Sequence, residues 1–186
     1  MKRSVVAAKT IKIFFRVLLI SAVGTLFVYN MYLIIARTVF GIGMPTVFGY
    51  GGATVVSGSM ADEIEVGDFV ITKAQDEYDV GDVITFYDDE SGAYITHRII
   101  LVSGDDYVTK GDANAAADDF SVPSSAVVGK VVSVWKGFGK FADFLKSPFG
   151  MISVFGGCAV LWIIADIVSA IFVKKQKERS EQDRIV

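Results

Sequence analysis

The sequence predicts a mainly β domain flanked by two membrane-spanning helices. Two long apolar runs lie toward the ends of the 186-residue chain, and 52% of all residues are hydrophobic, which is more apolar than an ordinary soluble domain of this size. Between the runs, short segments rich in β-branched residues alternate with Gly, Asp and Pro, a pattern typical of strands and turns. We therefore expect five parts, with boundaries at 1–16, 17–36, 37–148, 149–173 and 174–186.

The first apolar run comprises the 20 residues from Val17 to Ala36, none of which carries a formal charge. At about 1.5 Å of rise per helical residue, this run is long enough to cross a hydrocarbon layer of about 30 Å. The alternative is a cleavable signal peptide. Its apolar part usually spans only about 7–15 residues and ends at a small-x-small cleavage site, which does not follow this run cleanly. We therefore expect a retained anchor.

The second apolar run, residues 149–173, is also long enough to cross the membrane and contains one charge, Asp166. A carboxylate at that depth is costly unless it is paired or near water, so Asp166 indicates a contact with another helix or a role within the membrane.

Basic residues lie outside both apolar runs. Lys2, Arg3, Lys9, Lys12 and Arg16 precede the first, and Lys174, Lys175, Lys177 and Arg179 follow the second. Segments rich in Lys and Arg tend to remain cytoplasmic. We therefore expect a multi-pass protein of the cell membrane, or of the endoplasmic reticulum membrane in a eukaryote, with both termini cytoplasmic and residues 37–148 outside the cytoplasm.

The segment between the runs is acidic and patterned for strands. Residues 37–149 contain 17 acidic and 8 basic residues, which argues against nucleic-acid binding. The strands expected from β-branched and alternating residues are Ala53–Ser57, Phe69–Ala74, Val83–Tyr87, Tyr94–Val102, Tyr107–Lys110 and Val127–Trp135. Two strands follow similar turns, Val66-Gly67-Asp68 and Val80-Gly81-Asp82, in which Gly permits positive φ and Asp binds neighbouring amides.

The segment Phe40–Gly52, which joins the first apolar run to the first strand, is apolar and rich in aromatic residues and Gly. It is expected either to lie at the membrane surface, where Phe and Tyr are favoured, or to be a flexible linker.

Metals and cofactors are not expected. The single cysteine, Cys158, lies within the second apolar run, which excludes an intramolecular disulfide and makes a cysteine nucleophile implausible. One histidine and this cysteine cannot supply a zinc site. The segment 110–119 resembles a loose calcium loop but lacks the Gly and terminal Glu placement of an EF-hand.

Ser59 is a candidate nucleophile because an apolar strand leads into the small-residue turn Ser57-Gly58-Ser59. Such a turn exposes a side chain and leaves backbone amides unpaired nearby. The Ser57 hydroxyl, with a backbone amide, could donate to the oxyanion of a tetrahedral intermediate. Most such tripeptides are ordinary turns.

The only histidine, His97, lies in the middle of an expected strand. A neutral imidazole is a natural general base near neutral pH, although a structural histidine is the alternative. Asp112, Asp118 and Asp119 offer carboxylates that could orient it, while the remaining ones would cap the turn or pair with Arg98.

These motifs, taken in order, resemble the sequence boxes of the type I signal peptidases, family S26. Ser57-Gly58-Ser59-Met60 is followed by Gly67-Asp68, then His97-Arg98-Ile99-Ile100, then Thr109-Lys110-Gly111-Asp112 with Asp118 six residues later. The resemblance runs from about Val55 to Val132 and follows an anchor. Because histidine stands where most bacterial members have lysine, the chain resembles the archaeal and endoplasmic-reticulum branch, which uses Ser, His and Asp.

The resemblance implies a signal-peptidase-like β domain and a membrane-bound serine endopeptidase that removes signal peptides from translocated preproteins. Ser59 is then the nucleophile, His97 the general base, and Asp118 or Asp112 the acidic partner, with Ser57 and Ser59 at the oxyanion. Asp118 fits the family spacing better than Asp119. The implied partners are preproteins, membrane lipid and the secretion translocon, and substrates have small side chains one and three residues before the cut.

One departure concerns Asp62, which stands where the family commonly has proline, so the turn after Ser59 is expected to differ. Two alternatives remain open. The first is a peptidase with Lys73 or Lys110 as base. The second is a catalytically silent membrane protein whose β domain binds or assembles secreted proteins.

Overall fold

The computed structural model describes residues 2–185. In chain order, its elements are α1 (Lys2–Thr38), β1 (Tyr50–Thr54), β2 (Phe69–Lys73), β3 (Val83–Asp88), β4 (Ala93–Ser103), β5 (Asp106–Lys110), β6 (Ser121–Pro123), a 3-10 turn η1 (Ser124–Ala126), β7 (Val127–Trp135), α2 (Gly139–Lys146) and α3 (Pro148–Ile185). The chain divides into two compact units. One contains α1 as far as Asn30 and the chain from Leu145 onward; the other is Met31–Phe144.

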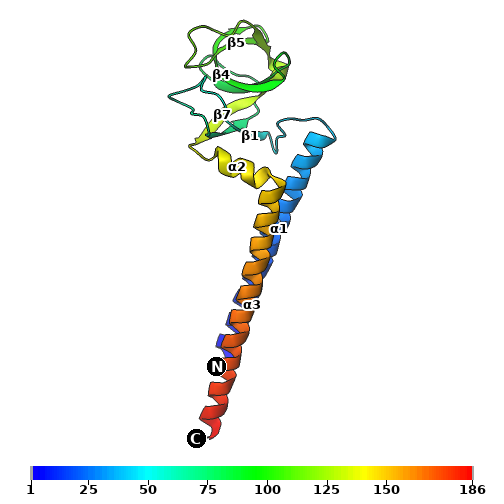
Figure 1. Cartoon of the computed structure of the whole chain (residues 1–186), viewed down its shortest axis with the longest axis vertical. Coiled ribbons are helices and arrows are strands. Elements are labelled where there is room, and N and C mark those ends of the chain that lie inside the picture. The colour runs from blue at the N-terminus through cyan, green and yellow to red at the C-terminus, as the bar shows by residue number, and fades with distance from the viewer. Residues whose placement is uncertain (1, 186) are drawn as a thin grey trace. The chain divides into compact units, whose positions relative to one another are not determined.

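The Met31–Phe144 unit is built on one antiparallel sheet, which confirms the expected mainly β domain. The strand order is β1-β2-β7-β3-β4-β5-β6, so β7, the last strand in sequence, lies between β2 and β3. Figure 1 shows this sheet strongly curved around β4 and β5. The pairs β2–β7, β3–β7 and β4–β5 each contain an irregularity in register, which is typical of bulges that bend a sheet.

Two hydrophobic cores occupy the two faces of β3, because successive residues of a strand point to opposite sides. Ile84 and Phe86 belong to a core with Tyr78, Ile99, Tyr107 and Val122. Val83 belongs to a second core with Met60, Ile64 and Val70. The second core includes the residue directly after Ser59, so packing fixes the course of the β1–β2 loop.

Five of the six expected strands lie where the sequence predicted them, within one or two residues at each end. The prediction for the first was wrong: β1 is Tyr50–Thr54, not Ala53–Ser57. Its glycines allow close approach, since a Cβ on Gly52 would lie 2.6 Å from the Phe69 ring. The short edge strand β6 and the helix α2 were not predicted.

The two similar turns before β2 and β3 have the structure that their sequences predicted. Gly67 and Gly81 have φ values of 91° and 98°. Asp68 Oδ2 accepts a hydrogen bond from the Glu65 amide at 2.9 Å, and Asp82 Oδ2 accepts one from the Asp79 amide at 3.2 Å. Each turn therefore uses Gly for the backbone and Asp for the amides.

The helices α1 and α3 contain the two apolar runs. Among the described residues, Arg16–Thr38 and Pro148–Ile171 are long and apolar enough to cross a membrane, and few or none of their residues are buried within the protein. Apolar helices of this length that the protein itself leaves uncovered are typical of membrane proteins.

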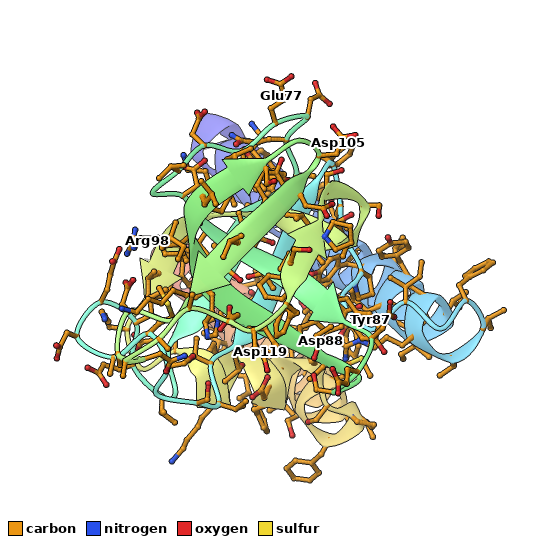
Figure 2. The ribbon with its side chains drawn as sticks, turned by 90° about the horizontal axis from the view of Figure 1, so that it is seen from above. Glu77, Tyr87, Asp88, Arg98, Asp105 and Asp119 are labelled. Atoms are coloured by element: carbon orange, nitrogen blue, oxygen red, sulfur yellow. The ribbon has the colours of Figure 1, made fainter. Side chains whose placement is uncertain are left out.

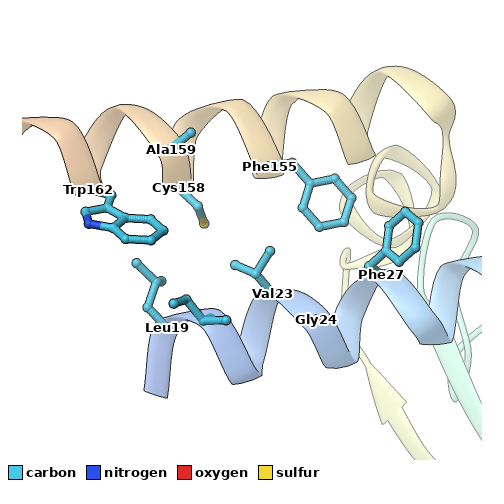
Figure 3. A pocket seen from close by; sticks show the side chains of 9 residues that line it. Leu19, Val23, Gly24, Phe27, Phe155, Cys158, Ala159 and Trp162 are labelled. Atoms are coloured by element: carbon cyan, nitrogen blue, oxygen red, sulfur yellow. The ribbon is translucent and has the colours of Figure 1, made fainter. Parts of the chain in front are cut away.

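Within their unit, α1 and α3 make side-chain contacts along their length. Phe27 and Phe155 have ring centroids 5.9 Å apart, and a cavity of about 440 Å³ lies between the helices, beside Cys158 and Trp162 (Figure 3). Asp166 pairs with Arg16 of α1. The helix contact expected for Asp166 is therefore made within the chain.

Candidate active site

The candidate residues lie on three segments of the Met31–Phe144 unit. Ser57 and Ser59 are in the loop between β1 and β2, His97 is in β4, and the aspartates follow β5. Candidates on different segments are 15 to 62 residues apart in the chain, so the sheet determines which of them meet.

His97 lies on the face of β4 that covers a hydrophobic core. It is opposite Ile84 of β3, and the buried Ile99 follows on the same face. Phe86 meets the imidazole edge-on, with ring centroids 6.5 Å apart. Only 7% of His97 is exposed, so its ring nitrogens need partners within the protein.

Asp118 is the partner of one of these nitrogens. Its Oδ2 atom lies 2.7 Å from His97 Nδ1. The Thr109 hydroxyl donates to the same oxygen at 2.6 Å, and the Asp118 amide donates to the Thr109 carbonyl at 2.9 Å. These contacts hold the carboxylate in one orientation. A carboxylate so placed keeps the imidazole proton on Nδ1 and leaves Nε2 as an acceptor.

The Nε2 atom of His97 faces the backbone at Gly111 and Ser59. A Cβ on Gly111 would lie 2.9 Å from His97 Nε2 and 2.6 Å from the Ser59 carbonyl oxygen. The Ala113 amide donates to the same carbonyl at 2.9 Å, which joins the loop after β1 to the loop after β5. Glycine at position 111 is therefore required for the two loops to approach His97 together.

The Ser59 hydroxyl faces the Ser57 hydroxyl, with 3.4 Å between their Oγ atoms. Among the described residues, this is the hydrogen bond of the Ser59 side chain, and none joins it to His97. Rotation about the Cα–Cβ bond would move the hydroxyl without moving the loop, and catalytic hydrogen bonds are often long before substrate binds. The structure thus brings Ser57, Ser59, His97 and Asp118 to one place, without the Ser–His hydrogen bond.

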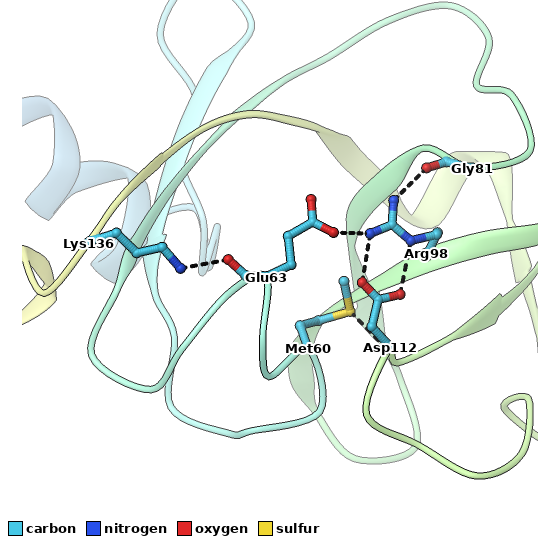
Figure 4. Close-up of polar contacts among 6 residues, drawn as sticks. All are labelled: Met60, Glu63, Gly81, Arg98, Asp112 and Lys136. Atoms are coloured by element: carbon cyan, nitrogen blue, oxygen red, sulfur yellow. Dashed lines mark hydrogen bonds and ion pairs between the residues drawn. The ribbon is translucent and has the colours of Figure 1, made fainter.

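Asp112 pairs with Arg98, the residue after His97 in β4. Arg98 donates from Nε and Nη2 to the two Asp112 carboxylate oxygens at 2.9 and 2.6 Å (Figure 4). Both carboxylate oxygens of Asp112 are thus bonded to Arg98, whereas His97 affects this carboxylate only through its charge. The hydrogen bond from Arg98 keeps the pKa of Asp112 below its usual value.

Arg98 also contacts two other segments. It donates from Nη1 to the Gly81 carbonyl at 2.8 Å and pairs with Glu63 in the β1–β2 loop. Figure 4 shows Glu63 and Asp112 approaching the same guanidinium group. One side chain therefore connects the loop of Ser59 with the loop of Asp118.

The remaining candidates do not reach His97. Asp119 is exposed, as are Glu77 and Asp105 on the outside of the same domain (Figure 2). Lys110 pairs with Arg98 between β4 and β5, so the two side chains lie on the same face of the sheet. The His97 side chain lies on the opposite face. The Lys73 ammonium group lies 5.2 Å from the centre of the Tyr50 ring.

Asp68 supports the site in a way that the sequence reasoning missed. It is 3% exposed and accepts hydrogen bonds from the Glu65 and Gly137 amides at 2.9 and 2.8 Å. Lys136 lies 3.1 Å from Asp68 and donates to the Glu63 carbonyl at 2.6 Å. Burial by itself raises the pKa of Asp68, but the two amides and Lys136 outweigh it, so the pKa is lowered. The Gly-Asp turn was a signal for the amide bonds; nothing local indicated Lys136.

The expected difference at Asp62 is visible in the backbone. Asp62 has a φ of 78°, and its amide donates to Glu65 Oε1 at 3.2 Å. Proline has a fixed φ near −65° and no amide proton, so it could not adopt this conformation. The turn after Ser59 therefore has a geometry that excludes proline.

Comparison with known proteins points to one family. A family model described as "Signal peptidase, peptidase S26" matches residues 8–118, which include Ser59, His97 and Asp118. The chain is also 44% identical over 92 residues to "Signal peptidase I W" of Bacillus subtilis (strain 168). This match covers 46% of the chain and 48% of that protein, so the chain spans about half the length of the curated relative it matches.

Proposed function

We propose, from the premise that the chain belongs to the signal peptidase family, peptidase S26, that it is a membrane-bound serine endopeptidase that removes signal peptides from translocated preproteins. The observation that carries this proposal is the buried pair of His97 and Asp118, whose second imidazole nitrogen faces the loop of Ser59. The name of the Bacillus relative agrees with this activity.

In the proposed reaction, His97 Nε2 accepts the proton of the Ser59 hydroxyl as Oγ attacks the carbonyl carbon of the scissile bond. Asp118 holds the Nδ1 proton and stabilises the imidazolium. The imidazolium then gives the proton to the leaving amine as the C–N bond breaks, which leaves an ester on Ser59. Water, deprotonated by the same imidazole, hydrolyses the ester, releases the carboxylate and restores the Ser59 hydroxyl.

The oxyanion that forms on the attacked carbonyl needs hydrogen-bond donors. We assign this role to the Ser57 hydroxyl and the Ser59 backbone amide. The support is the 3.4 Å separation of the two serine hydroxyls, which puts Ser57 beside any carbonyl that Ser59 attacks. Preference for small side chains one and three residues before the cut follows if the substrate is extended, because these two side chains then point to the same face.

Among the aspartates, we assign the third catalytic position to Asp118, which puts the chain in the Ser, His and Asp branch found in archaea and the endoplasmic reticulum. Both Asp112 oxygens are bonded to Arg98, which favours a structural role for Asp112. The same geometry disfavours Lys110 as the base.

We further propose that both apolar runs cross the membrane, with both termini cytoplasmic and the β domain on the opposite side. The basic segments outside the runs and the acidic domain between them support this orientation. Signal peptides are themselves apolar segments in the membrane, so anchoring raises their effective concentration near the site. The proposed partners are preproteins, membrane lipid and the secretion translocon.

The test is cleavage of a preprotein by the detergent-solubilised full chain and its variants. Ser59→Ala and His97→Ala should each lower kcat/KM by at least about a thousandfold, because each removes a group of the proposed triad. Asp118→Ala should also be strongly impaired, whereas Asp119→Ala, the matched exposed control, should cleave like the wild type. Circular dichroism would establish that each variant is folded.

Other results would change the assignment. Full activity of His97→Ala would implicate a lysine base. Equal loss in Asp112→Ala and Asp118→Ala, with both proteins folded, would leave the third position undecided between them. A wild type that cuts no preprotein would favour the alternative in which the domain binds or assembles secreted proteins.

A further inference from the structure

The segment between α1 and β1 ends in a tight hairpin whose tip carries Phe48. Val47 and Tyr50 exchange two backbone hydrogen bonds of 2.9 Å, and Phe48 and Gly49 between them have φ values of 52° and 78°. Positive φ at both central positions is typical of a type I′ turn, for which Asn-Gly is preferred. Phenylalanine is unfavourable there, and Phe48 is also 95% exposed. Neither the conformational preference of the turn nor packing in the core therefore explains why residue 48 is a phenylalanine.

The hairpin is attached to the sheet. The Ala74 amide, at the end of β2, donates to the Gly49 carbonyl at 2.8 Å. The Met44 amide donates to the Tyr94 hydroxyl of β4 at 3.1 Å, and a Cβ on Gly43 would lie 2.7 Å from the Tyr94 ring. The segment is therefore fastened at both ends, which does not agree with a flexible linker.

The segment also turns back along α1. The last turns of α1, from Met31, belong to the same compact unit as the sheet. The Tyr32 hydroxyl donates to the Thr46 carbonyl at 2.7 Å, and the Ile42 amide donates to the Ala36 carbonyl at 2.9 Å. Tyr32 precedes the end of α1 by six residues, or about 9 Å along the helix axis. The chain that leads into the hairpin thus turns back along the Met31–Thr38 part of α1 as far as Thr46, two residues before Phe48.

We propose that the Phe48 hairpin inserts into the lipid surface beside α1 and sets the height of the domain above the membrane. The proposal rests on the membrane-spanning role proposed for α1. Lipid is the occupant because the adjacent helix is apolar and because Val39 and Phe40, at its end, are each 70% exposed. The free energy gained by burying the Phe48 ring at the boundary of the bilayer would offset the cost of its positive φ in the turn. The domain is acidic, so attraction to anionic headgroups is not the driving force.

The test places a tryptophan at the tip of the hairpin. The full chain, with Trp135→Phe and Trp162→Phe, would carry either Phe48→Trp or Val80→Trp and be reconstituted in phosphatidylcholine vesicles. Val80 is a suitable control because it is apolar, 61% exposed and on the turn before β3. Tryptophan at 48 should emit at shorter wavelength and be quenched by lipids brominated near the headgroup, at low and high salt alike. Tryptophan at 80 should show neither effect.

Two results would overturn the proposal. Equal quenching at positions 48 and 80, or none at 48, would exclude selective insertion. A shift to shorter wavelength at 48 without quenching by brominated lipid would identify a protein contact in place of lipid. Because fluorescence does not depend on activity, this test decides the inference even if no preprotein is cleaved.

A second variant separates insertion from folding. Phe48→Asn suits the type I′ turn, so its Tm in detergent should equal or exceed that of the wild type. Cleavage of a preprotein embedded in vesicles should fall several-fold, while cleavage of a soluble peptide should not change. Unchanged cleavage of the embedded preprotein would refute the role in setting the height of the domain.

Discussion

Gly111 shows how a residue without a side chain determines the geometry of this site. The loop after β5 approaches both His97 and Ser59 at this point, and the space for a Cβ is occupied by the Ser59 carbonyl, the Asn114 amide group and His97 Nε2. The sequence motif Lys110-Gly111-Asp112 draws attention to its charged members. The structure indicates that the glycine between them also cannot be replaced by a larger residue without displacing its neighbours.

Gly111→Ala should therefore destabilise the domain by about 1–3 kcal/mol, as overpacking does, and abolish most preprotein cleavage. Denaturant unfolding and kcat/KM would measure the two effects. Gly58→Ala is the control for folding, because a Cβ at Gly58 meets no atom within 4 Å. If Gly111→Ala is as stable and as active as the wild type, the two loops do not pack as described.

Protonation of Asp68 should lower the stability of the Ser59 loop. Its pKa is lowered in the folded protein, so the unfolded chain takes up this proton first as the pH falls. The stability contributed by Asp68 is therefore complete above its usual pKa of about 4 and is lost as the pH falls through the lower, folded value.

Asp68→Asn should lower the free energy of unfolding near neutral pH by about 1–3 kcal/mol, because two amides and Lys136 lose a buried charged acceptor. It should also flatten the decline of Tm between about pH 5 and pH 2. Thermal unfolding across this range would measure both effects, with the exposed Asp119→Asn as control. A decline as steep as that of the wild type would mean that other carboxylates cause the acid sensitivity.

At the scale of elements, β4 uses its two faces for different tasks. His97 faces the site and the first core, whereas Arg98, the next residue, lies on the opposite face and joins the β1–β2 loop to the loop after β5. Arg98 donates through three nitrogens and so can bind both carboxylates and a carbonyl at once. The position of Ser59 relative to Asp118 thus depends on a side chain that touches neither.

Arg98→Gln should lower kcat by about tenfold or more, with little change in KM, because misplaced catalytic groups slow the chemical step. Asp112→Asn should have a smaller effect, and Glu63→Gln the smallest, since the Glu63 side chain is 58% exposed. The effects of Arg98→Gln and Asp112→Asn should not add in the double variant. Additive losses would show that the two residues act separately.

At the scale of the whole molecule, the distribution of charge predicts how the chain lies in the membrane. Cations lie outside both apolar runs, and the domain between the runs has an excess of acids. The activity proposed above, on translocated preproteins, also requires a site on the side opposite the cytoplasm. The two arguments are independent and predict the same orientation.

Cysteine labelling would test this orientation. In a Cys158→Ser background, Ser91→Cys, in the turn between β3 and β4, should react with a membrane-impermeant maleimide in intact cells. Ser180→Cys, after the second apolar run, should react only after permeabilisation. The reverse pattern would contradict the proposed topology, and labelling of both sites in intact cells would contradict two membrane crossings.

The sequence by itself determined the features that depend on neighbouring residues. The two apolar runs, the β-rich segment between them and the Gly-Asp turns were all predictable, because hydrophobic periodicity and turn chemistry are local properties. The order of the motifs indicated Ser59 and His97 as candidates. Local propensity gave the wrong bounds for β1, because glycine has a low strand propensity. Gly51 and Gly52 nevertheless lie in this strand, and Thr72 and Phe69 of β2 occupy the space that larger side chains would need.

Only the tertiary structure shows that Asp118 contacts His97 and that Asp112 pairs with Arg98, although the two aspartates are six residues apart in one loop. The partner that each carboxylate reaches depends on strand register and on the path of the loop after β5, and neither is encoded in spacing alone. The same reason applies to Lys136 beside Asp68, to Arg16 beside Asp166 and to Thr46 beside Tyr32 of α1. Each of these contacts joins segments that are distant in sequence, so packing determined it and local pattern did not.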